Sequence, residues 1–343
     1  MIGKNDGCKA GLQAMATDLM LALGESEHIP RGVHNSGIVT EVRHFLEQQD
    51  SGNRWFVSCD NRLALGMFAS LIMEFNPEKL PWIRPAGSRV LAFRLRPLMP
   101  FEGVEGIIAA MCAGYRCVIN ITEENRKQAG LIARLVNAYL KDTEQLLSFT
   151  TGPLPRFDAI VNYGSPLSEA GIGYLSGYRL LDLSDPGYRT IALSGKETGP
   201  DLSRVADLVC SFFGRTSWNL RSILVPEGYH FDPLIEEMKK YRWQMYHAGY
   251  FNHYDYGKAA LLTGGHEHID TGHLLLTAKE FFRGRIAVLH YGFYKPDEIN
   301  SPDFKLSGPD TDGRWRQNPF EGMLKKRLET LCKFLFQQIE GCE

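Results

Sequence analysis

Apolar residues recur at three- and four-residue spacing along the first 80 positions, a pattern typical of helices with one buried side. It predicts helices over Lys9–Leu23, Gly37–Gln48 and Ser58–Met73. The third helix is the clearest, because Ser58 or Asp60 can cap its first turn. We therefore expect a helical segment ahead of the first strand.

From Arg89 onward, short apolar runs alternate with helical patterns, which predicts an α/β fold built on a parallel sheet. We expect the stretch from Thr150 to Pro155 to be a loop. The predicted strands are Arg89–Leu95, Arg116–Ile121, Phe157–Tyr163, Arg179–Leu183 and Thr190–Leu193, and the predicted helices are Glu102–Ala113, Glu123–Leu147, Leu167–Leu175 and Leu202–Phe213.

The second half repeats this alternation in a smaller unit. A polar stretch rich in proline and glycine, Tyr294–Asn318, then precedes an amphipathic tail helix over Glu321–Gln338, which we expect to dock on the body or on another subunit. We place the domain boundaries at 1–195, 196–310 and 311–343. The further elements predicted here are strands at Ser222–Val225, His273–Leu276 and Arg285–His290, and helices at Pro233–Tyr241 and Tyr254–Leu262.

Length and charge narrow the class of protein. The 343 residues suffice for about two domains. The net charge is −2 and no long basic run is present, which argues against a nucleic-acid partner. The first residues lack the apolar core of a signal peptide, and no run approaches 18 apolar residues, so we expect a cytoplasmic protein without a membrane span.

The cysteines and histidines give little indication of a disulfide or a metal site. The seven cysteines include no C-x-x-C pair, which favours reduced thiols over disulfides or a zinc ribbon. His266 and His268, with Asp270 and His273 nearby, form the most metal-like cluster, but flanking glycines indicate a turn and favour surface histidines, so we predict no metal site.

Two further motifs have alternative interpretations. Gly171–Gly177 imitates a dinucleotide fingerprint, but it begins several residues past the predicted strand and favours a helix rich in small residues. The aromatic segment Tyr246–Tyr256 is either a wall that faces a ligand or the start of a core helix.

Several ordered segments together carry a family resemblance. They are Asn53–Phe56, Phe157–Ser165, Ala206–Tyr229 and Asn252–Lys258, within roughly residues 50 to 295. In these segments the chain resembles the acyl-CoA reductase family, the fatty-acyl reductases of the aldehyde dehydrogenase superfamily. The resemblance implies an aldehyde dehydrogenase-like fold with a cofactor-type parallel-sheet domain and a smaller catalytic-type domain. It also implies NADPH as cofactor, a fatty acyl-CoA or similar acyl ligand, and a homodimer.

Members of that family use a cysteine to accept the acyl group as a thioester, which hydride then reduces to the aldehyde. The matching position here is Ser217. A serine hydroxyl is almost wholly protonated at pH 7, whereas a cysteine is a few per cent thiolate. Neither Arg215, Thr216 nor Trp218 is a base that could activate Ser217, and Cys210 lies about two helical turns away.

Two more positions depart from the family pattern. The oxyanion-donating asparagine corresponds to Leu98, which has no side-chain hydrogen to donate. The lysine that reaches the cofactor ribose corresponds to Asn120, which brings no positive charge. Gly164 and Ser165, in contrast, match the turn that lines the cofactor diphosphate with backbone N–H groups at a helix N-terminus.

Two hypotheses follow. The first is a non-catalytic or severely impaired acyl-CoA reductase homologue that keeps its site to bind a ligand or partner. The second is a working reductase with Ser217 as the acyl-accepting nucleophile, which then needs a base from elsewhere in the fold, such as His247 or His253.

Overall fold

A computed structural model describes residues 3–24, 34–48, 52–80, 87–140, 144–184, 189–294 and 319–340. The chain divides into two compact units, and each is described by itself. Unit 1 comprises Met1–Asp185 together with Met323–Glu343, and unit 2 comprises Pro186–Gly322. Cys342 and residues 295–318 of the predicted polar stretch lie outside the described residues.

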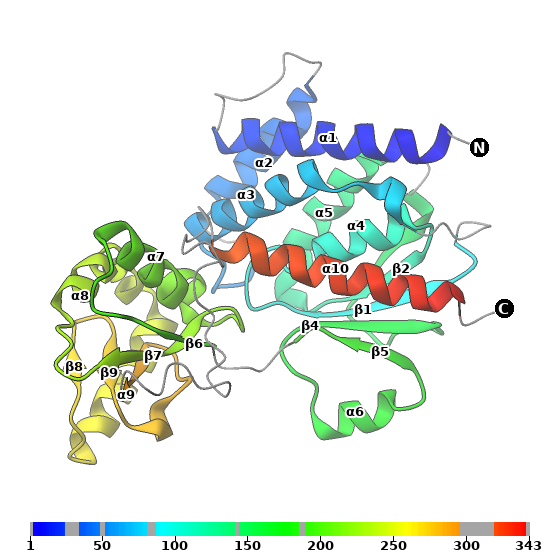
Figure 1. The fold of residues 1–343 in the computed structure, drawn as a ribbon. Helices are drawn as coiled ribbons and strands as arrows, with labels where there is room; N and C mark the ends of the chain where they lie inside the picture. The colour runs from blue at the N-terminus through cyan, green and yellow to red at the C-terminus, as the bar shows by residue number, and fades with distance from the viewer. Residues whose placement is uncertain are drawn as a thin grey trace. The chain divides into compact units, whose positions relative to one another are not determined.

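Unit 1 is built on a five-stranded parallel sheet with the strand order β3-β2-β1-β4-β5 (Figure 1). From β1 the chain adds β2 and β3 on one side and then β4 and β5 on the other, so the strand order reverses between β1 and β4. The carboxyl ends of β1 and β4 therefore form a topological switch point, where ligands usually bind in such a sheet. The strands are β1 (Val90–Arg96), β2 (Arg116–Asn120), β3 (Leu147–Thr150), β4 (Ala159–Gly164) and β5 (Arg179–Asp182).

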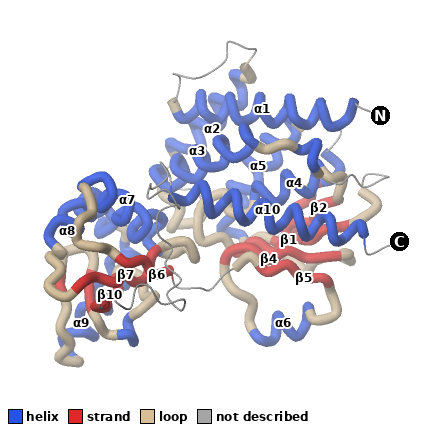
Figure 2. The backbone as a smooth tube through the Cα atoms, viewed as in Figure 1, coloured by secondary structure: helices blue, strands red, loops and turns tan. Residues whose placement is uncertain are grey.

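Helices cover both faces of this sheet unequally, as Figure 2 shows. Among the residues that the structure describes, one short helix packs on one face, where its Leu175 joins Ala92 and Ile160 in an apolar cluster. The other face carries the remaining helices of unit 1 (Figure 1). They are α1 (Gly3–Leu23), α2 (Ser36–Glu47), α3 (Ser58–Glu74), α4 (Val104–Cys112), α5 (Arg126–Tyr139) and α10 (Pro319–Glu340), which belongs to unit 1 from Met323 onward and to unit 2 before it; the helix on the first face is α6 (Glu169–Leu175).

The tail helix α10 docks on unit 1. Of the two predicted alternatives, the body of the chain or another subunit, the structure shows the first. Its stripe of Leu324, Leu328, Leu331 and Leu335 is buried. The hydroxyl of Tyr115 donates to the carbonyl of Leu335 at 3.5 Å. A helix that follows unit 2 in the sequence therefore belongs to the core of unit 1.

Unit 2 holds a second five-stranded sheet, in the order β6-β7-β10-β9-β8, with only β8 antiparallel. The strands and helices of unit 2 confirm the α/β prediction in outline, and in unit 1 the helix predicted over Gly171–Gly177 is confirmed as α6, which ends at Leu175. The elements of unit 2 are β6 (Arg189–Ala192), β7 (Leu220–Pro226), β8 (Ile269–Asp270), β9 (Leu275–Thr277), β10 (Val288–Tyr294), α7 (Gly199–Cys210), α8 (Asp232–Met238), the 3₁₀ segment η5 (Lys239–Tyr246) and α9 (Ala248–Thr263).

Some predicted elements were wrong. The helix predicted over Glu123–Leu147 ends at Tyr139, and Leu147–Thr150 is edge strand β3, paired with β2. The helix predicted over Leu202–Phe213 ends at Cys210, because Phe212 and Phe213 adopt left-handed backbone angles that no helix accepts. The last strand begins at Val288 rather than Arg285, because residues 284–287 form a turn.

None of the described helices combines the length and apolar character that crossing a membrane requires. Of the six described cysteines, all with free thiols, Cys112, Cys117 and Cys210 are buried.

One pair of cysteines is placed for oxidation. The Sγ atoms of Cys8 in α1 and Cys112 in α4 lie 3.0 Å apart, about 1 Å more than a disulfide bond. A hydrogen bond from Cys112 lowers the pKa of Cys8 and so favours its thiolate. We predict that a small-molecule disulfide crosslinks this pair: the Cys8 thiolate displaces one thiol of the reagent, and Cys112 then displaces the other. Peptide mass spectrometry should find the Cys8–Cys112 linkage.

The variant Cys8→Ser is the control for this reaction and should leave Cys112 unmodified. The hydrogen bond with Cys8 and burial both raise the pKa of Cys112, and its burial persists in the variant. A linkage through the exposed Cys59 instead would contradict the prediction.

Candidate functional site

Leu98 lies in the loop that follows β1, at the switch point of unit 1. The loop turns sharply, since Phe101 and Gly103 both have left-handed angles, with φ of 56° and 89°. The backbone N–H of Leu98 donates to Oε2 of Glu102 at 2.7 Å. The Leu98 side chain has no donor, and its main-chain donor is already engaged within the loop.

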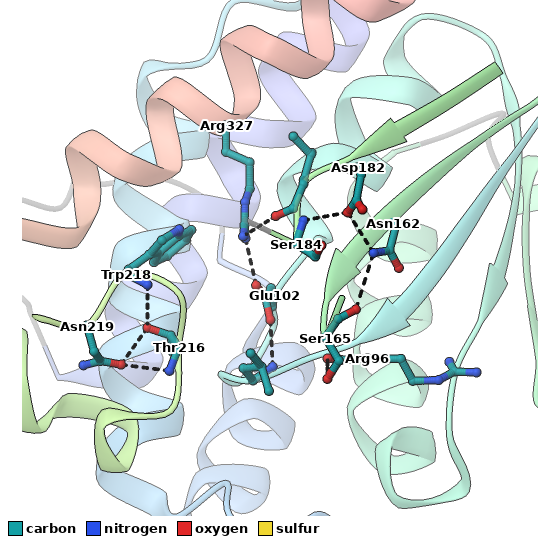
Figure 3. Close-up of polar contacts among 12 residues, drawn as sticks. Arg96, Glu102, Asn162, Ser165, Asp182, Ser184, Thr216, Trp218, Asn219 and Arg327 are labelled. Carbon is teal, nitrogen blue, oxygen red and sulfur yellow. Dashed lines mark hydrogen bonds and ion pairs between the residues drawn. The ribbon is translucent and has the colours of Figure 1, made fainter. Parts of the chain in front are cut away.

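A buried ion pair fixes this loop to the tail helix (Figure 3). Nη1 of Arg327 on α10 lies 2.9 Å from Oε1 of Glu102, and the two side chains are only 5% and 3% exposed. Nη2 of Arg327 donates to the carbonyl of Leu183 at 2.9 Å, and the guanidinium lies 5.2 Å from the ring centre of Tyr163. The charge of the Glu102 carboxylate, which accepts the N–H of Leu98, is thus balanced by Arg327, a residue distant in the sequence.

Glu105, one turn further along α4, is the second acid at the start of this helix. Burial raises the pKa of its carboxyl to about 7, although Arg327 opposes the shift. Within the described part of the chain, its buried Oε1 has no hydrogen-bond partner. Glu105 therefore titrates near neutral pH inside the core of unit 1.

Glu105 should make the stability of unit 1 depend on pH. Its folded-state pKa of about 7 lies above the ordinary 4.5, so the stabilisation by the neutral carboxyl is complete below pH 4.5 and is lost as pH rises through 7. We predict that Glu105→Gln, which cannot ionise, gains stability over the wild type between pH 5 and pH 8 by up to about 3 kcal/mol. Urea unfolding at both pH values measures the difference.

The matched variant Glu124→Gln removes an exposed carboxylate and should show no comparable gain. An equal gain in both variants would contradict a special role for burial at Glu105.

Asn120 lies at the carboxyl end of β2 and is bound by an arginine of β1. Nη2 of Arg96 donates to Oδ1 of Asn120 at 2.7 Å, and Nδ2 of Asn120 donates to the carbonyl of Gly152 at 2.7 Å. Two residues earlier, Nη1 of Arg94 donates to Oδ1 of Asn162 at 2.6 Å and to the carbonyl of Ser165 at 3.0 Å. Both arginines therefore bring positive charge to this edge of the sheet.

Sequence reasoning missed these two arginines. Burial lowers their pKa values, but a guanidinium keeps its charge. The sequence does contain a signal for them. Arg94 and Arg96 are two residues apart in an otherwise apolar strand, so both side chains lie on the same face of the sheet, near the carboxyl end of β1.

Gly164 and Ser165 form the turn after β4 and close it against β1. A Cβ on Gly164, whose φ is 84°, would lie 1.9 Å from the carbonyl oxygen of Arg96, so only glycine fits. The N–H of Ser165 donates to that same oxygen at 2.9 Å. Helix α6 begins only at Glu169, so the expected helix N-terminus does not coincide with Ser165, whose N–H is already used.

Ser217 lies in unit 2, in the tight loop between α7 and β7. Three successive residues, Phe212, Phe213 and Gly214, have left-handed φ angles of 54°, 58° and 63°. Aromatic packing holds the two phenylalanines in this costly conformation: Phe212 contacts Phe320, and Phe213 contacts Trp243, His247 and Tyr250.

Asn219 fastens the same loop with its side chain (Figure 3). Its Oδ1 accepts from the N–H of Thr216 at 2.8 Å and from the Thr216 hydroxyl at 2.7 Å. Its Nδ2 donates to the carbonyls of Leu208 and Ser211, both at 2.9 Å. Asn219 is fully buried and joins the end of α7 to the start of β7.

Ser217 itself is half-buried, and within the described residues its hydroxyl has no hydrogen-bond partner. His247 uses Nδ1 to accept the N–H of Tyr250 as the N-cap of α9. Burial and the neighbouring Arg215 lower the pKa of His253. Cys210 is fully buried, and burial raises the pKa of its thiol. No base that could activate Ser217 is therefore found in contact with it among these residues.

The predicted site residues thus form two groups, one in each unit. In unit 1, Arg96 joins Asn120 to the Gly164–Ser165 turn, and Leu98 lies in the loop that begins after Arg96. Ser217 belongs to unit 2. In the histidine cluster, Nδ1 of His268 lies 2.9 Å from the carbonyl of His266, and the described residues include no group of three side chains arranged to hold a metal.

Comparison with known proteins establishes the fold. No family model and no curated sequence matches the chain. A NAD-dependent benzaldehyde dehydrogenase from Corynebacterium glutamicum matches with a TM-score of 0.57 at 12% identity, over 86% of this chain and 74% of its own. A NAD-dependent aldehyde dehydrogenase from Sinorhizobium meliloti matches with a TM-score of 0.55 at 16% identity, over 85% and 67%. The chain has an aldehyde dehydrogenase-like fold.

A lactaldehyde dehydrogenase structure matches similarly, with a TM-score of 0.56 at 12% identity, over 87% of this chain and 71% of its own. At identities this low, the similarity concerns the fold, and the reaction has to be argued from the site.

Proposed function

We propose that the chain is an acyl-CoA reductase-like protein of the aldehyde dehydrogenase superfamily whose catalysis is impaired and whose site serves to bind a ligand. The observation that carries this proposal is Ser217. Its hydroxyl has no base in contact with it among the described residues, and its loop is held by Asn219 in one conformation. An unactivated serine is too weakly nucleophilic to take an acyl group from a thioester.

The oxyanion position supports the same conclusion. Acyl transfer needs donors aimed at the oxygen where negative charge develops, and the loss of one donor typically costs 10²–10³-fold in turnover. Leu98 has an apolar side chain, and Glu102 accepts its backbone N–H. The alternative hypothesis, with His247 or His253 as a base for Ser217, loses support because His247 already caps α9.

NADPH binding is part of the proposal, and the residues of unit 1 fit an anionic cofactor at one edge. Arg94 and Arg96 place two guanidinium groups at the carboxyl ends of β1 and β2, where the charge missing from Asn120 is needed. Bound NADPH would supply a hydride for reduction. We therefore propose that nucleotide binding is retained even though acyl transfer is impaired.

The test is incubation of the protein with acyl-CoAs of eight to eighteen carbons, followed by intact-mass measurement and an assay of NADPH oxidation. We expect neither an acyl adduct nor turnover. A stoichiometric adduct on Ser217 with steady NADPH consumption would overturn the proposal in favour of the active enzyme.

Restoring the family's nucleophile should not restore the reaction. We predict that Ser217→Cys gains a thiol that alkylating agents can modify but shows no efficient NADPH oxidation with acyl-CoA, because Leu98 still lacks a donor. Adding Leu98→Asn should raise any turnover by about 10²–10³-fold. Efficient turnover by Ser217→Cys alone would show that the Leu98 position is not limiting.

A further inference from the structure

Unit 2 contains a cavity of about 580 Å³ that Ser217 does not line, although His253, one of the two bases considered for Ser217, does. One wall comes from α9 and the other from the turn that precedes β10. The polar groups in its lining are Asn252, His253, Tyr256 and Arg285. Arg285 is the only lining residue with a permanent charge.

Aromatic rings hold the Arg285 side chain in place. Its guanidinium carbon lies 4.6 Å from the ring centre of Phe281, 4.9 Å from that of Phe282 and 5.9 Å from that of Tyr256. Within the described residues, no carboxylate pairs with Arg285. Its neighbour Arg283, in contrast, forms an ion pair with Glu280. The positive charge of Arg285 thus lies against aromatic rings and has no counter-charge in the part of the chain that the structure describes.

The backbone around Arg285 is strained in a way that fixes this wall. Gly284 has a φ of 81°, and Ala287, which is not a glycine, has a φ of 61°. A left-handed alanine costs about 1–2 kcal/mol. Backbone hydrogen bonds nevertheless stabilise the turn at both ends: the N–H of Arg285 donates to the carbonyl of Phe282, and the N–H of Leu275 donates to the carbonyl of Ala287. Such outliers persist where a site requires them.

The opposite wall, formed by α9, exposes an aromatic ring. Tyr256 on α9 is 66% exposed although its ring lies beside the guanidinium of Arg285. Burial and the neighbouring Arg215 lower the pKa of His253, which favours the neutral form of its imidazole. Asn252 adds an amide. The cavity therefore combines one fixed cation, one exposed ring and neutral polar groups.

We propose that this cavity binds a small anion that carries a planar apolar group, with its carboxylate or phosphate on Arg285 and its ring stacked on Tyr256. A guanidinium forms bidentate hydrogen bonds to either kind of anion. This site is a function beyond acyl reduction: it needs neither Ser217 nor a nucleotide, so its test is independent of the function proposed above.

Calorimetric titration of the whole protein with naphthalene-2-carboxylate and with 2-naphthyl phosphate tests the site, with naphthalene-2-carboxamide as the uncharged analogue. We expect at least one anion to bind and the amide to bind at least tenfold more weakly. The tighter of the two anions identifies the preferred group. Failure of both anions to bind, or equal binding of the amide, would overturn the proposal.

Two pairs of variants assign the binding to the cavity. Arg285→Met keeps an apolar stem against the rings and should weaken binding at least tenfold, whereas Arg204→Met, which removes an equal charge from α7, should change it less than twofold. Tyr256→Ala should weaken binding several-fold and Tyr256→Phe less than twofold. If Arg285→Met is folded by circular dichroism and binds like the wild type, the proposed site is wrong.

Discussion

Replacing Arg327 with methionine is expected to lower the free energy of unfolding of unit 1 by about 3–5 kcal/mol, the usual cost of removing one partner from a buried ion pair. The variant leaves the carboxylate of Glu102, which is 3% exposed, without its counter-charge, and leaves the carbonyl of Leu183 without its donor. Methionine fills a similar volume, so the loss reports the charge rather than a cavity. Urea unfolding followed by circular dichroism measures it.

Lys325→Met is the matched control on the same helix. Lys325 pairs with Glu74 at 3.3 Å on the surface, and exposed pairs contribute only about 0–1 kcal/mol. Adding Glu102→Gln to Arg327→Met should recover part of the lost stability, because the uncompensated charge is then gone. A loss below about 1 kcal/mol in Arg327→Met would show that Glu102 is not held by this pair.

Hydrogen exchange should localise the effect of Arg327→Met. Since Glu102 accepts the N–H of Leu98, loss of the ion pair should speed exchange in residues 97–103 as well as in α10. Peptides of unit 2 should exchange as in the wild type. Uniform acceleration throughout the chain would mean that the change is not local.

The second large effect is expected at Asn219. Replacing Asn219 with alanine removes the acceptor of two Thr216 groups and the donor of two carbonyls, all buried. Each buried group left without a partner costs about 1–3 kcal/mol, so a loss on the order of 4 kcal/mol is expected. The left-handed angles of Phe212 and Phe213 should relax, which exchange of residues 211–219 can detect.

Ser217→Ala provides the comparison in the same loop. Ser217 is half-buried and makes no hydrogen bond with the described residues, so this variant should lose less than about 0.5 kcal/mol. If Asn219→Ala were equally harmless, the loop would be held by its aromatic contacts instead. If Ser217→Ala were strongly destabilising, Ser217 would have a structural role that the hydrogen bonds do not indicate.

The sequence predicted the fold where patterns are local. Alternating apolar runs and helices led to the parallel sheet, and the apolar stripe of the tail predicted a docked helix, because both signals repeat within one element. The edge strand Leu147–Thr150 was missed because it is half-exposed and short, and it follows a long helical pattern without a break. Tertiary pairing with β2, which no local signal reports, makes it a strand.

The site was predictable only in part, and for a similar reason. The family resemblance pointed to Asn120 and Gly164, which lie at the carboxyl ends of β2 and β4. The pairing of Glu102 with Arg327 spans 225 positions, and the positive charge beside Asn120 comes from a different strand. The left-handed Phe212 and Phe213 have no composition signal, because non-glycine residues rarely adopt such angles and contacts from distant parts of unit 2, such as Trp243 against Phe213, help to keep them there.

The docking of α10 on unit 1 also sets an order of events during synthesis. On a ribosome, residues 1–185 emerge before α10, so Glu102 has no counter-charge until Arg327 has been made. Unit 2, encoded in one continuous stretch, is complete before that point. The Leu98 loop can therefore reach its final form only after α10, which follows the whole of unit 2 in the sequence, has been made.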